Sequence, residues 1–371
     1  MTRPLAVVLA EPHSVAEKLA AALSGDGPAI LPHASPSSVV GSPPELVPQR
    51  IALVVETSGS TGRPKRVALS ADALLAGAAA SDSALGGPGQ WMLALPAHYI
   101  AGIAVLVRAL AAQVPPVYLD PAGFTADRFV AAAGELDHPR RFVSLVPAQL
   151  ARLVDSPDAI EVLRGFARVL VGGQSMPGAL AARTAELGLP ITRTYGSSET
   201  SGGCVYDGVP IGDTRVRIVD GRVEIAGSSL AEGYLDDPRR TAFAFHDDDG
   251  HRWYRTDDAG ELTDGVLRVL GRLDDVIVSG GVKVSLAAVE DAVRALPGLE
   301  LAVIVPSQHP EWGETAVVVS EVEVELGDLR RIVAERLGAP AAPTRVVLVD
   351  RIPMLPSGKP DRVALTALVL S

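Results

Sequence analysis

Short apolar runs alternate with amphipathic stretches along the first half of the chain. The runs have the length of buried strands and lie at Leu5–Ala10, Ile51–Val55, Trp91–Leu95, Val117–Asp120, Arg141–Val146 and Arg168–Val171. The stretches have helical spacing and lie at Val15–Leu23, Ser70–Ala80, Asp127–Glu135 and Leu180–Leu187. A further stretch, Gly102–Ala112, is apolar all round except for Arg108, which predicts a buried helix. Strands that alternate with helices predict an α/β domain with a largely parallel sheet.

The pattern changes twice in the second half of the chain. From about Arg215, closely spaced strands are joined by turns such as Asp220-Gly221, which predicts a β-rich subdomain. After Asp275, a hairpin, helices and strands predict a small α+β unit. We therefore expect two domains: residues 1–273, with mainly parallel sheets flanked by helices plus the β-rich part, and residues 274–371.

Composition excludes several classes of protein. The chain has 371 residues, of which 47% are hydrophobic and 21% charged, so it is long enough for two folded domains and is not disordered. A formal net charge of −11 argues against binding to nucleic acid or to an anionic membrane. The single cysteine, Cys204, suits a reducing compartment, and no apolar segment reaches membrane-spanning length, so we expect no membrane insertion and a cytoplasmic location.

A loop of glycines and hydroxyls follows the strand Ile51–Val55 and leads towards the helical pattern from Ser70. Its glycines allow tight turns with inward N–H groups, its hydroxyls add donors, and its lysine adds a point charge. These features are typical of a polyphosphate site, although a surface turn of small residues is the alternative. The candidate residues are Thr57, Ser58, Gly59, Ser60, Thr61, Gly62 and Lys65.

Lysine is rare in this chain. Only four of its 33 basic residues are lysines, and three of these fall in segments that stand out for other reasons: Lys65, Lys283 and Lys359. A retained lysine points to a need for a compact ammonium that the planar fork of arginine does not supply. Lys359 lies in the glycine turn Pro356–Pro360, where an exposed surface lysine is the alternative.

Two further segments follow predicted strands and can line a ligand crevice, because the carboxyl ends of parallel strands meet at one edge of a sheet. They supply Gly172, Gly173 and Gln174, and then Thr194, Tyr195, Gly196, Ser197, Ser198 and Glu199. A carboxylate beside phosphates needs a shared Mg²⁺, which makes Glu199 the candidate metal ligand; a solvated glutamate is the alternative. Farther on, Asp258 could accept both hydroxyls of a ribose, with Arg272 as a donor.

Taken together, these segments resemble the adenylate-forming superfamily, which contains acyl- and aryl-CoA synthetases, adenylation domains and luciferases. The resemblance covers about residues 50 to 362, and its elements occur in the family's order. They are Thr57–Lys65, Thr194–Thr200, Tyr254–Asp258, Gly271–Val284 and Ser357–Lys359.

The resemblance implies an ATP-binding domain and a mobile C-terminal lid. Thr57–Lys65 would hold the β- and γ-phosphates, Tyr195 and Gly172–Gln174 would enclose adenine, and Ser198 and Glu199 would bind phosphate and Mg²⁺. Asp258 and Arg272 would bind ribose, Asp274 would be the hinge, and Lys359 would bridge the attacking carboxylate and the α-phosphate. Gly280-Gly281 would line the path of a thiol after the lid moves, and Lys283 would contact CoA, although a solvated lysine is as plausible.

Three departures from the family pattern stand out. Thr256-Asp257-Asp258 replaces the usual Thr-Gly-Asp, and Val278 stands where many members have lysine. The chain before the phosphate loop is also shorter than in most members. The core chemistry is intact, but the affinity for the nucleotide is left open.

The segment Leu95–Arg108 resembles the o-succinylbenzoate–CoA ligases of menaquinone synthesis, in which an arginine six residues after a glycine grips the carboxylate that is not activated. Arg108 has this spacing from Gly102. A buried arginine is costly without an anion, so a dicarboxylate substrate or a protein carboxylate must pair with it. His98 would line or gate the acyl pocket, or is simply a buried imidazole, and Ser197 would also face the substrate.

We therefore expect an AMP-forming acid–thiol ligase that uses ATP, Mg²⁺ and CoA, with 2-succinylbenzoate as the acid. The alternatives are another aryl- or acyl-CoA ligase, an adenylation enzyme that loads a carrier protein, and a non-catalytic nucleotide-binding protein. Lys65, Glu199 and Lys359 together argue against the last of these. A homodimer is a further expectation.

Overall fold

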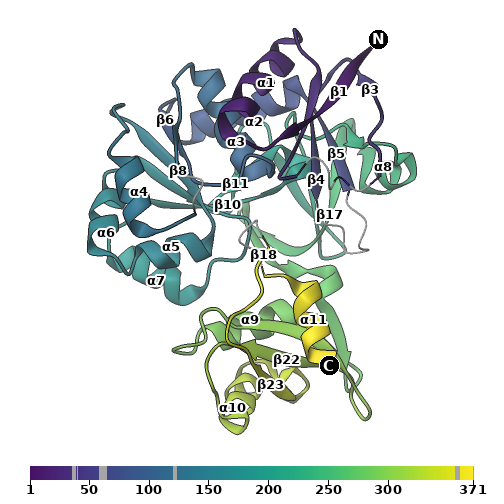
Figure 1. The fold of residues 1–371 in the computed structure, drawn as a ribbon. Helices are drawn as coiled ribbons and strands as arrows, with labels where there is room; N and C mark the ends of the chain where they lie inside the picture. The colour runs from purple at the N-terminus through teal and green to yellow at the C-terminus, as the bar shows by residue number, and fades with distance from the viewer. Residues whose placement is uncertain (36–38, 40, 58–64, 120–122, 356–359, 371) are drawn as a thin grey trace.

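The computed structural model describes the chain apart from residues 36–38, 40, 58–64, 120–122, 356–359 and 371. Its described strands form four sheets, of which three lie in a large upper body and one in a smaller lower unit (Figure 1). This arrangement confirms the predicted α/β fold class with a β-rich part and an α+β C-terminal part.

The first sheet has the order β15-β5-β4-β2-β1-β3, with β1–β2 and β2–β4 parallel. Its strands are β1 (Thr2–Leu9), β2 (Ala29–His33), β3 (Leu46–Pro48), β4 (Ile51–Thr57), β5 (Lys65–Ser70) and β15 (Gly233–Tyr234). The sequence pattern did not predict β5, which pairs antiparallel with β4, so the glycine-rich loop joins a hairpin. Ser70 ends β5 and caps the next helix by accepting a hydrogen bond from Ala73 N.

The second sheet has the order β12-β11-β10-β9-β8-β6-β7 and is parallel from β10 to β7. Its strands are β6 (Gln90–Leu93), β7 (Val117–Tyr118), β8 (Arg141–Leu145), β9 (Arg168–Val171), β10 (Ile191–Ser197), β11 (Gly202–Tyr206) and β12 (Val209–Pro210). We expected the segment that contains Thr194–Ser197 to follow a strand, but these residues are themselves part of β10 because they pair with β11, while Arg193 before them pairs with β9.

Helices cover these two sheets. In chain order they are α1 (Pro12–Ser24), α2 (Ala71–Ala84), α3 (Ile100–Ala112), α4 (Ala126–Ala133), α5 (Pro147–Leu153), α6 (Pro157–Arg164) and α7 (Gly178–Glu186). α1 packs on strands of the first sheet, α3 packs on strands of the second, and α2 contacts strands of both. Helices α4 to α7 surround the outer side of the second sheet (Figure 1). Within the described part of the chain, no helix is both long and apolar enough to cross a bilayer.

The third sheet confirms the predicted β-rich part. It has the order β13-β14-β17-β16, with β18 also paired to β17. Its elements are β13 (Arg215–Val219), β14 (Arg222–Ala226), β16 (Phe245–Asp248), β17 (His251–Thr263) and β18 (Val266–Arg272), with helix α8 (Pro238–Ala244) beside it. The segment Tyr254–Asp258 lies within the long strand β17.

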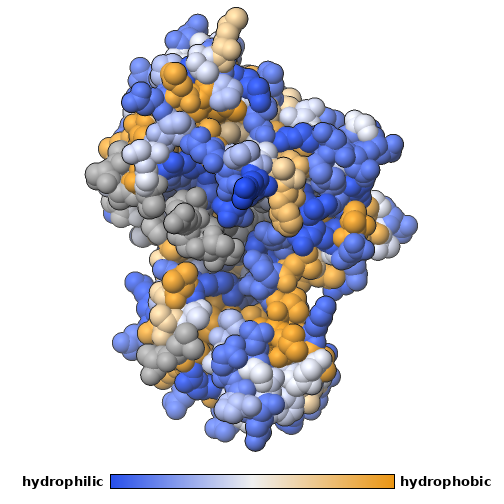
Figure 2. Space-filling model, turned by 90° about the vertical axis from the view of Figure 1, so that its right-hand side faces the viewer, coloured by the Kyte–Doolittle hydropathy of each residue, from blue (hydrophilic) through white to orange (hydrophobic). Residues whose placement is uncertain are grey.

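The fourth sheet has the order β20-β19-β22-β21, with β23 paired to β22. Its elements are β19 (Val276–Ser279), β20 (Val282–Ser285), β21 (Val303–His309), β22 (Gly313–Ser320) and β23 (Arg345–Leu348), with helices α9 (Leu286–Arg294), α10 (Leu326–Leu337) and α11 (Arg362–Leu370). Residues from 277 onward form their own hydrophobic clusters. Figure 2 shows a constriction between this unit and the larger body.

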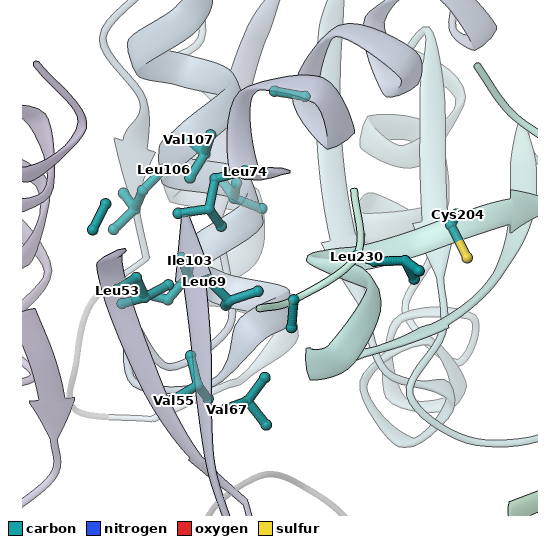
Figure 3. Packing of buried hydrophobic residues seen from close by; sticks show 14 of the residues in the cluster. Leu53, Val55, Val67, Leu69, Leu74, Ile103, Leu106, Val107, Cys204 and Leu230 are labelled. Carbon is teal, nitrogen blue, oxygen red and sulfur yellow. The ribbon is translucent and has the colours of Figure 1, made fainter. Parts of the chain in front are cut away.

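The main core joins the first two sheets through α2 and α3. Leu53 and Val55 on β4 lie on the same face as Val67 and Leu69 on β5, because alternate strand residues share a face. Figure 3 shows these side chains with those of Leu74, Ile103, Leu106, Val107, Cys204 and Leu230. This packing fixes the start of β5 relative to the end of β10, where the candidate site lies.

Candidate active site

Glu199 is a buried carboxylate at the end of β10. The strand leads into a short 3₁₀ turn, Ser198–Thr200, and the Glu199 side chain is largely shielded from solvent. The hydroxyl of Tyr234 donates a 2.8 Å hydrogen bond to Glu199 Oε1. Burial and then the charge of Glu199 raise the pKa of the Tyr234 hydroxyl, so it remains a protonated donor.

Lys65 lies beside the same tyrosine. Its ammonium is 5.7 Å from the centre of the Tyr234 ring, and β15 pairs with β5, the strand that begins at Lys65. Thr57 is the cross-strand partner of Lys65, so the ends of the glycine-rich loop are held together here. The other candidates of this loop, Ser58, Gly59, Ser60, Thr61 and Gly62, lie outside the described residues.

The chemistry of Glu199 suits Mg²⁺ shared with phosphates. Of its two carboxylate oxygens, only Oε1 accepts a side-chain hydrogen bond from a described residue. The described residues contain no group of three or more His, Cys, Asp or Glu side chains that could hold a metal on its own. Mg²⁺ commonly binds one or two carboxylates and completes its shell with substrate phosphates and water. The donor set therefore fits Mg²⁺ brought by a nucleotide.

A second cluster joins Tyr195, Asp258 and Arg272. The Tyr195 hydroxyl donates a 2.6 Å hydrogen bond to Asp258 Oδ2, and Asp258 is the cross-strand partner of Arg272, with a charged contact of 3.9 Å. Burial raises the pKa of Asp258, while the Tyr195 hydrogen bond and the Arg272 charge lower it; the net shift is upward. The structure thus brings together the residues that we predicted around adenine and ribose.

Asp257, the departure from the family pattern, also contacts this cluster. Its carboxylate lies 3.4 Å from Arg272 and 3.4 Å from Arg222. Arg272 makes shorter hydrogen bonds to Asp274, of 2.7 and 2.8 Å. Burial raises the pKa of Asp274 and the Arg272 hydrogen bond lowers it, with a net shift downward. The predicted hinge residue is therefore tied to the predicted ribose site.

The glycines of the predicted adenine site allow close packing within the protein. A Cβ on Gly172 would lie 2.2 Å from Thr194 Oγ1, and one on Gly196 would lie 2.0 Å from the carbonyl oxygen of Gly202. Gly173 has a positive φ of 80° after β9. Gln174 follows it. The missing side chain at Gly172 thus allows the end of β9 to lie close to β10, and the one at Gly196 allows β10 to lie close to β11.

The predicted acyl-pocket residues lie at different places around α3. His98 precedes the helix, with its ring 4.1 Å from that of Tyr99, and burial lowers the pKa of His98 to about 4. Arg108 lies near the other end, about 12 Å along the helix from Ile100 at 1.5 Å per residue. Ser197 ends β10, and its buried hydroxyl has no hydrogen-bond partner among the described residues.

Arg108 is buried and has no carboxylate partner among the described residues. Its side chain donates a 3.3 Å hydrogen bond to the Tyr206 hydroxyl and lies 4.7 Å from the Trp91 ring. No described carboxylate lies within 4 Å of it, and its Nε has no hydrogen-bond partner there. It lines a cavity of about 10 Å³ together with residues of α2, α3 and Ser201. Asp82 is near enough for Arg108 to lower its pKa, but burial dominates and the net shift is upward.

The remaining candidates lie in the C-terminal unit. Gly280 and Gly281 form the two-residue turn between β19 and β20, with φ values of 56° and 80°. A Cβ on Gly280 would lie 2.8 Å from the Trp312 ring. Lys283 is exposed on β20. Lys359 lies outside the described residues.

Sequence reasoning missed two residues of the site, Tyr234 and Tyr206, and gave no role to Tyr254, although it begins the segment Tyr254–Asp258. Tyr254 is buried between the two clusters, and the charges of Glu199 and Asp258 help burial to raise its pKa. Tyr234 is 35 positions from Glu199, and Tyr206 is 98 positions from Arg108. A buried tyrosine usually has a hydrogen-bond partner, but the sequence does not say which one.

Comparison with known proteins identifies the family. Residues 5–235 match the family described as "AMP-binding enzyme", and residues 288–359 match "AMP-binding enzyme C-terminal domain". The chain is 41% identical over 331 residues to a Mycobacterium tuberculosis protein named "Probable 2-succinylbenzoate--CoA ligase", covering 86% of this chain and 85% of that protein. It is 30% identical over 308 residues to the Escherichia coli "2-succinylbenzoate--CoA ligase", covering 80% and 64% of the two chains.

Solved structures agree with this assignment. The fold matches a point variant of E. coli MenE "with bound OSB-AMS" with a TM-score of 0.78 and 26% identity, covering all of this chain and 88% of the other. A Bacillus subtilis o-succinylbenzoate CoA synthetase in complex with the intermediate OSB-AMP has a TM-score of 0.77 at 22% identity, covering 97% and 87%, and it supports the fold alone. The chain therefore belongs to the AMP-binding enzymes, the adenylate-forming family that its motifs resemble.

Proposed function

We propose that this chain is an ATP-dependent 2-succinylbenzoate–CoA ligase of menaquinone biosynthesis. It joins the acid to AMP with release of pyrophosphate, and then transfers the acyl group to CoA with release of AMP. The 41% identical relative carries this activity in its name, and the E. coli and Bacillus subtilis neighbours were solved with OSB-AMS and OSB-AMP.

The nucleotide lies along the crevice between the two clusters. Tyr195 and Gly172–Gln174 enclose adenine, the Asp258–Arg272 pair binds ribose, and Lys65 with its loop binds the phosphates. Glu199 and Ser198 complete the phosphate end. Mg²⁺ held there with Glu199 would neutralise charge on the phosphates as pyrophosphate leaves. Asp258 at one end of the crevice suits the ribose hydroxyls, and the positive charge of Lys65 at the other end suits the phosphates. These charges support the orientation of the nucleotide proposed here.

Arg108 binds the carboxylate that is not activated. A guanidinium buried beside Tyr206 and Trp91, with no described carboxylate within 4 Å, is incompletely paired in the ligand-free chain. An aromatic carboxylate would supply the missing anion. The incompletely paired guanidinium of Arg108 is therefore the main structural support for a dicarboxylate such as 2-succinylbenzoate as the substrate. Because the cavity beside Arg108 is only about 10 Å³, the side chains around it must move to admit the substrate.

His98 and Ser197 line the approach to the reacting carboxylate. With a pKa of about 4, the His98 imidazole is neutral at physiological pH and adds no charge that would compete with Arg108. The buried Ser197 hydroxyl, without a described partner, is free to donate to an acyl oxygen.

The C-terminal unit acts as a lid over this site. Lys359 stabilises the charge that gathers at the α-phosphate during adenylation. A turn about Asp274 then brings Gly280-Gly281 and Lys283 to the site for the CoA step. Release of the Arg272–Asp274 hydrogen bonds accompanies this turn. The domain boundary at residues 273 and 274, the cytoplasmic location and the homodimer stay predictions.

Exchange of labelled pyrophosphate into ATP tests the first half-reaction without CoA. Purified protein with Mg²⁺ and ATP would be assayed with 2-succinylbenzoate, benzoate and a set of short-chain and medium-chain acids. We expect exchange with 2-succinylbenzoate far above that with any monocarboxylate. Exchange with another acid but not with 2-succinylbenzoate would show that the other acid is the substrate. No exchange with any acid would contradict adenylate formation.

A further inference from the structure

We propose that Tyr234 is a positioning residue that holds Glu199 and Lys65 in the arrangement that binds the Mg²⁺-bound phosphates. This inference rests on the proposed function. Tyr234 comes from β15, outside the segments that carry the family resemblance. Its hydroxyl donates a hydrogen bond to Glu199, and the ammonium of Lys65 lies over its ring.

The hydroxyl fixes the orientation of the Glu199 carboxylate. Tyr234 and Glu199 are 7% and 6% exposed, so water does not compete for their 2.8 Å hydrogen bond. The bond occupies Oε1 and no described side chain donates to Oε2. Glu199 Oε2 is therefore left for Mg²⁺, and the carboxylate is held in one orientation before the metal binds. Hydrogen-bond partners of metal ligands commonly have this orienting role.

The ring provides a surface for cations. Lys65 Nζ lies 5.7 Å from the ring centre, and the guanidinium of Arg240 on α8 lies 5.9 Å from it. Both distances fall within the range of cation–π attraction. One aromatic side chain thus contacts the cation that begins β5 of the first sheet and the candidate Mg²⁺ ligand that follows β10 of the second sheet.

The backbone around Tyr234 is tightly fixed. Tyr234 pairs with Val67 on β5, two residues after Lys65, and Tyr234 N donates a 2.9 Å hydrogen bond to Thr241 Oγ1. Gly233 has a φ of 143°, and a Cβ there would lie 2.4 Å from Thr241 Cγ2. The backbone of Tyr234 is therefore fixed relative to β5, the strand that begins at Lys65. The hydrogen bond from its hydroxyl then fixes Glu199 relative to the same strand.

Tyr234→Phe tests this role because it removes the hydroxyl and keeps the ring. Isothermal titration calorimetry with α,β-methylene ATP, with and without Mg²⁺, measures how much Mg²⁺ tightens nucleotide binding. We expect that gain to fall about tenfold in the variant, the size expected when a hydrogen bond to a charged group is lost. Affinity without Mg²⁺ and the KM for 2-succinylbenzoate should be unchanged.

Tyr118→Phe is the matched control. It also removes one tyrosine hydroxyl, from β7, where the ring of Tyr118 contacts His13, and it should leave the Mg²⁺-dependent gain unchanged. Tyr234→Leu removes the ring as well. Unlike Tyr234→Phe, it should also weaken nucleotide binding without Mg²⁺, because Lys65 loses its cation–π contact.

Three results would overturn the inference. The first is the same Mg²⁺-dependent gain in Tyr234→Phe as in the unmodified protein. The second is an equal loss of affinity with and without Mg²⁺, which would indicate a structural role only. The third is no binding of the analogue to the unmodified protein, which would overturn the proposed function as well. In the first two cases pyrophosphate exchange by the unmodified protein would leave the proposed function standing.

Discussion

The hydroxyl of Tyr195 on β10 donates a 2.6 Å hydrogen bond to Asp258 on β17, and these strands belong to different sheets. The bond ties the predicted adenine side of the crevice to the predicted ribose side. It also favours the charged form of the Asp258 carboxylate and so opposes burial, which raises the pKa of that group.

Tyr195→Phe should weaken ATP binding without affecting the acid. The ring that lies against adenine is kept, but Asp258 loses a donor and, with it, part of its ability to accept ribose hydroxyls as a carboxylate. We expect the KM for ATP to rise by roughly three- to tenfold, consistent with the loss of one hydrogen bond of about 1 kcal/mol. Steady-state kinetics with ATP and acid varied separately measure this, and an unchanged KM for ATP would place the nucleotide elsewhere.

Arg108→Ala should impair use of a dicarboxylate far more than use of a monocarboxylate analogue. The difference in transition-state stabilisation should be roughly 2–5 kcal/mol, the range for loss of one partner of a buried charge pair. The measurement is kcat/KM for 2-succinylbenzoate and for an analogue that lacks the aromatic carboxylate. Equal losses for both acids would assign Arg108 to packing against Trp91 and Tyr206 alone.

His98 should make the folded protein less stable as the pH falls. Its pKa is about 4 in the folded chain and about 6.5 when unfolded. Between these values the unfolded chain binds more protons, so the free energy of unfolding declines as the pH drops from 6.5 towards 4. His98→Gln should show a smaller decline in urea unfolding between pH 7 and 5. The same decline in both proteins would show that the imidazole is not shielded.

Lys359→Ala should separate the two half-reactions. Because we assign Lys359 to the α-phosphate, adenylate formation should fall by orders of magnitude, while thioester formation from supplied acyl-adenylate should persist. Rapid-quench assays of each step make the comparison, with Lys283→Ala as the control that should affect the CoA step instead. Equal loss of both steps in Lys359→Ala would refute the assignment.

Cys204 should not react with thiol reagents in the folded protein. Burial raises the pKa of its thiol to about 12, so almost no thiolate is present at pH 8. Labelling with Ellman's reagent should be negligible until denaturant is added. Fast labelling of the native protein would contradict the burial of β11.

The sequence predicted much of the fold because local patterns carry it. The short apolar run Ile51–Val55 lies inside β4, and Ser70 before a helical pattern caps α2. The strand β5 was missed because Lys65 and Arg66 at its start interrupt any apolar run. The motif Thr194–Ser197 was placed after a strand, whereas its antiparallel pairing with β11 extends β10 through it, beyond the residues that pair with β9.

The site was predicted less completely because its contacts are distant in sequence. Residue types and spacing indicated Glu199, Asp258 and Arg108, but the partners of these side chains come from other sheets and helices. Tyr234 donates to Glu199 across 35 positions, and Tyr195 donates to Asp258 across 63. No local pattern encodes such pairs, which depend on how the sheets pack.

The most direct test of the proposed function is mass-spectrometric detection of the thioester. Purified protein would be incubated with ATP, Mg²⁺, CoA and 2-succinylbenzoate, with reactions lacking ATP or CoA as controls. We predict 2-succinylbenzoyl-CoA and AMP in equal amounts, and neither product in the controls. Thioester formed only from other acids would contradict the role of Arg108, and the absence of AMP with every acid would contradict the assignment as a ligase.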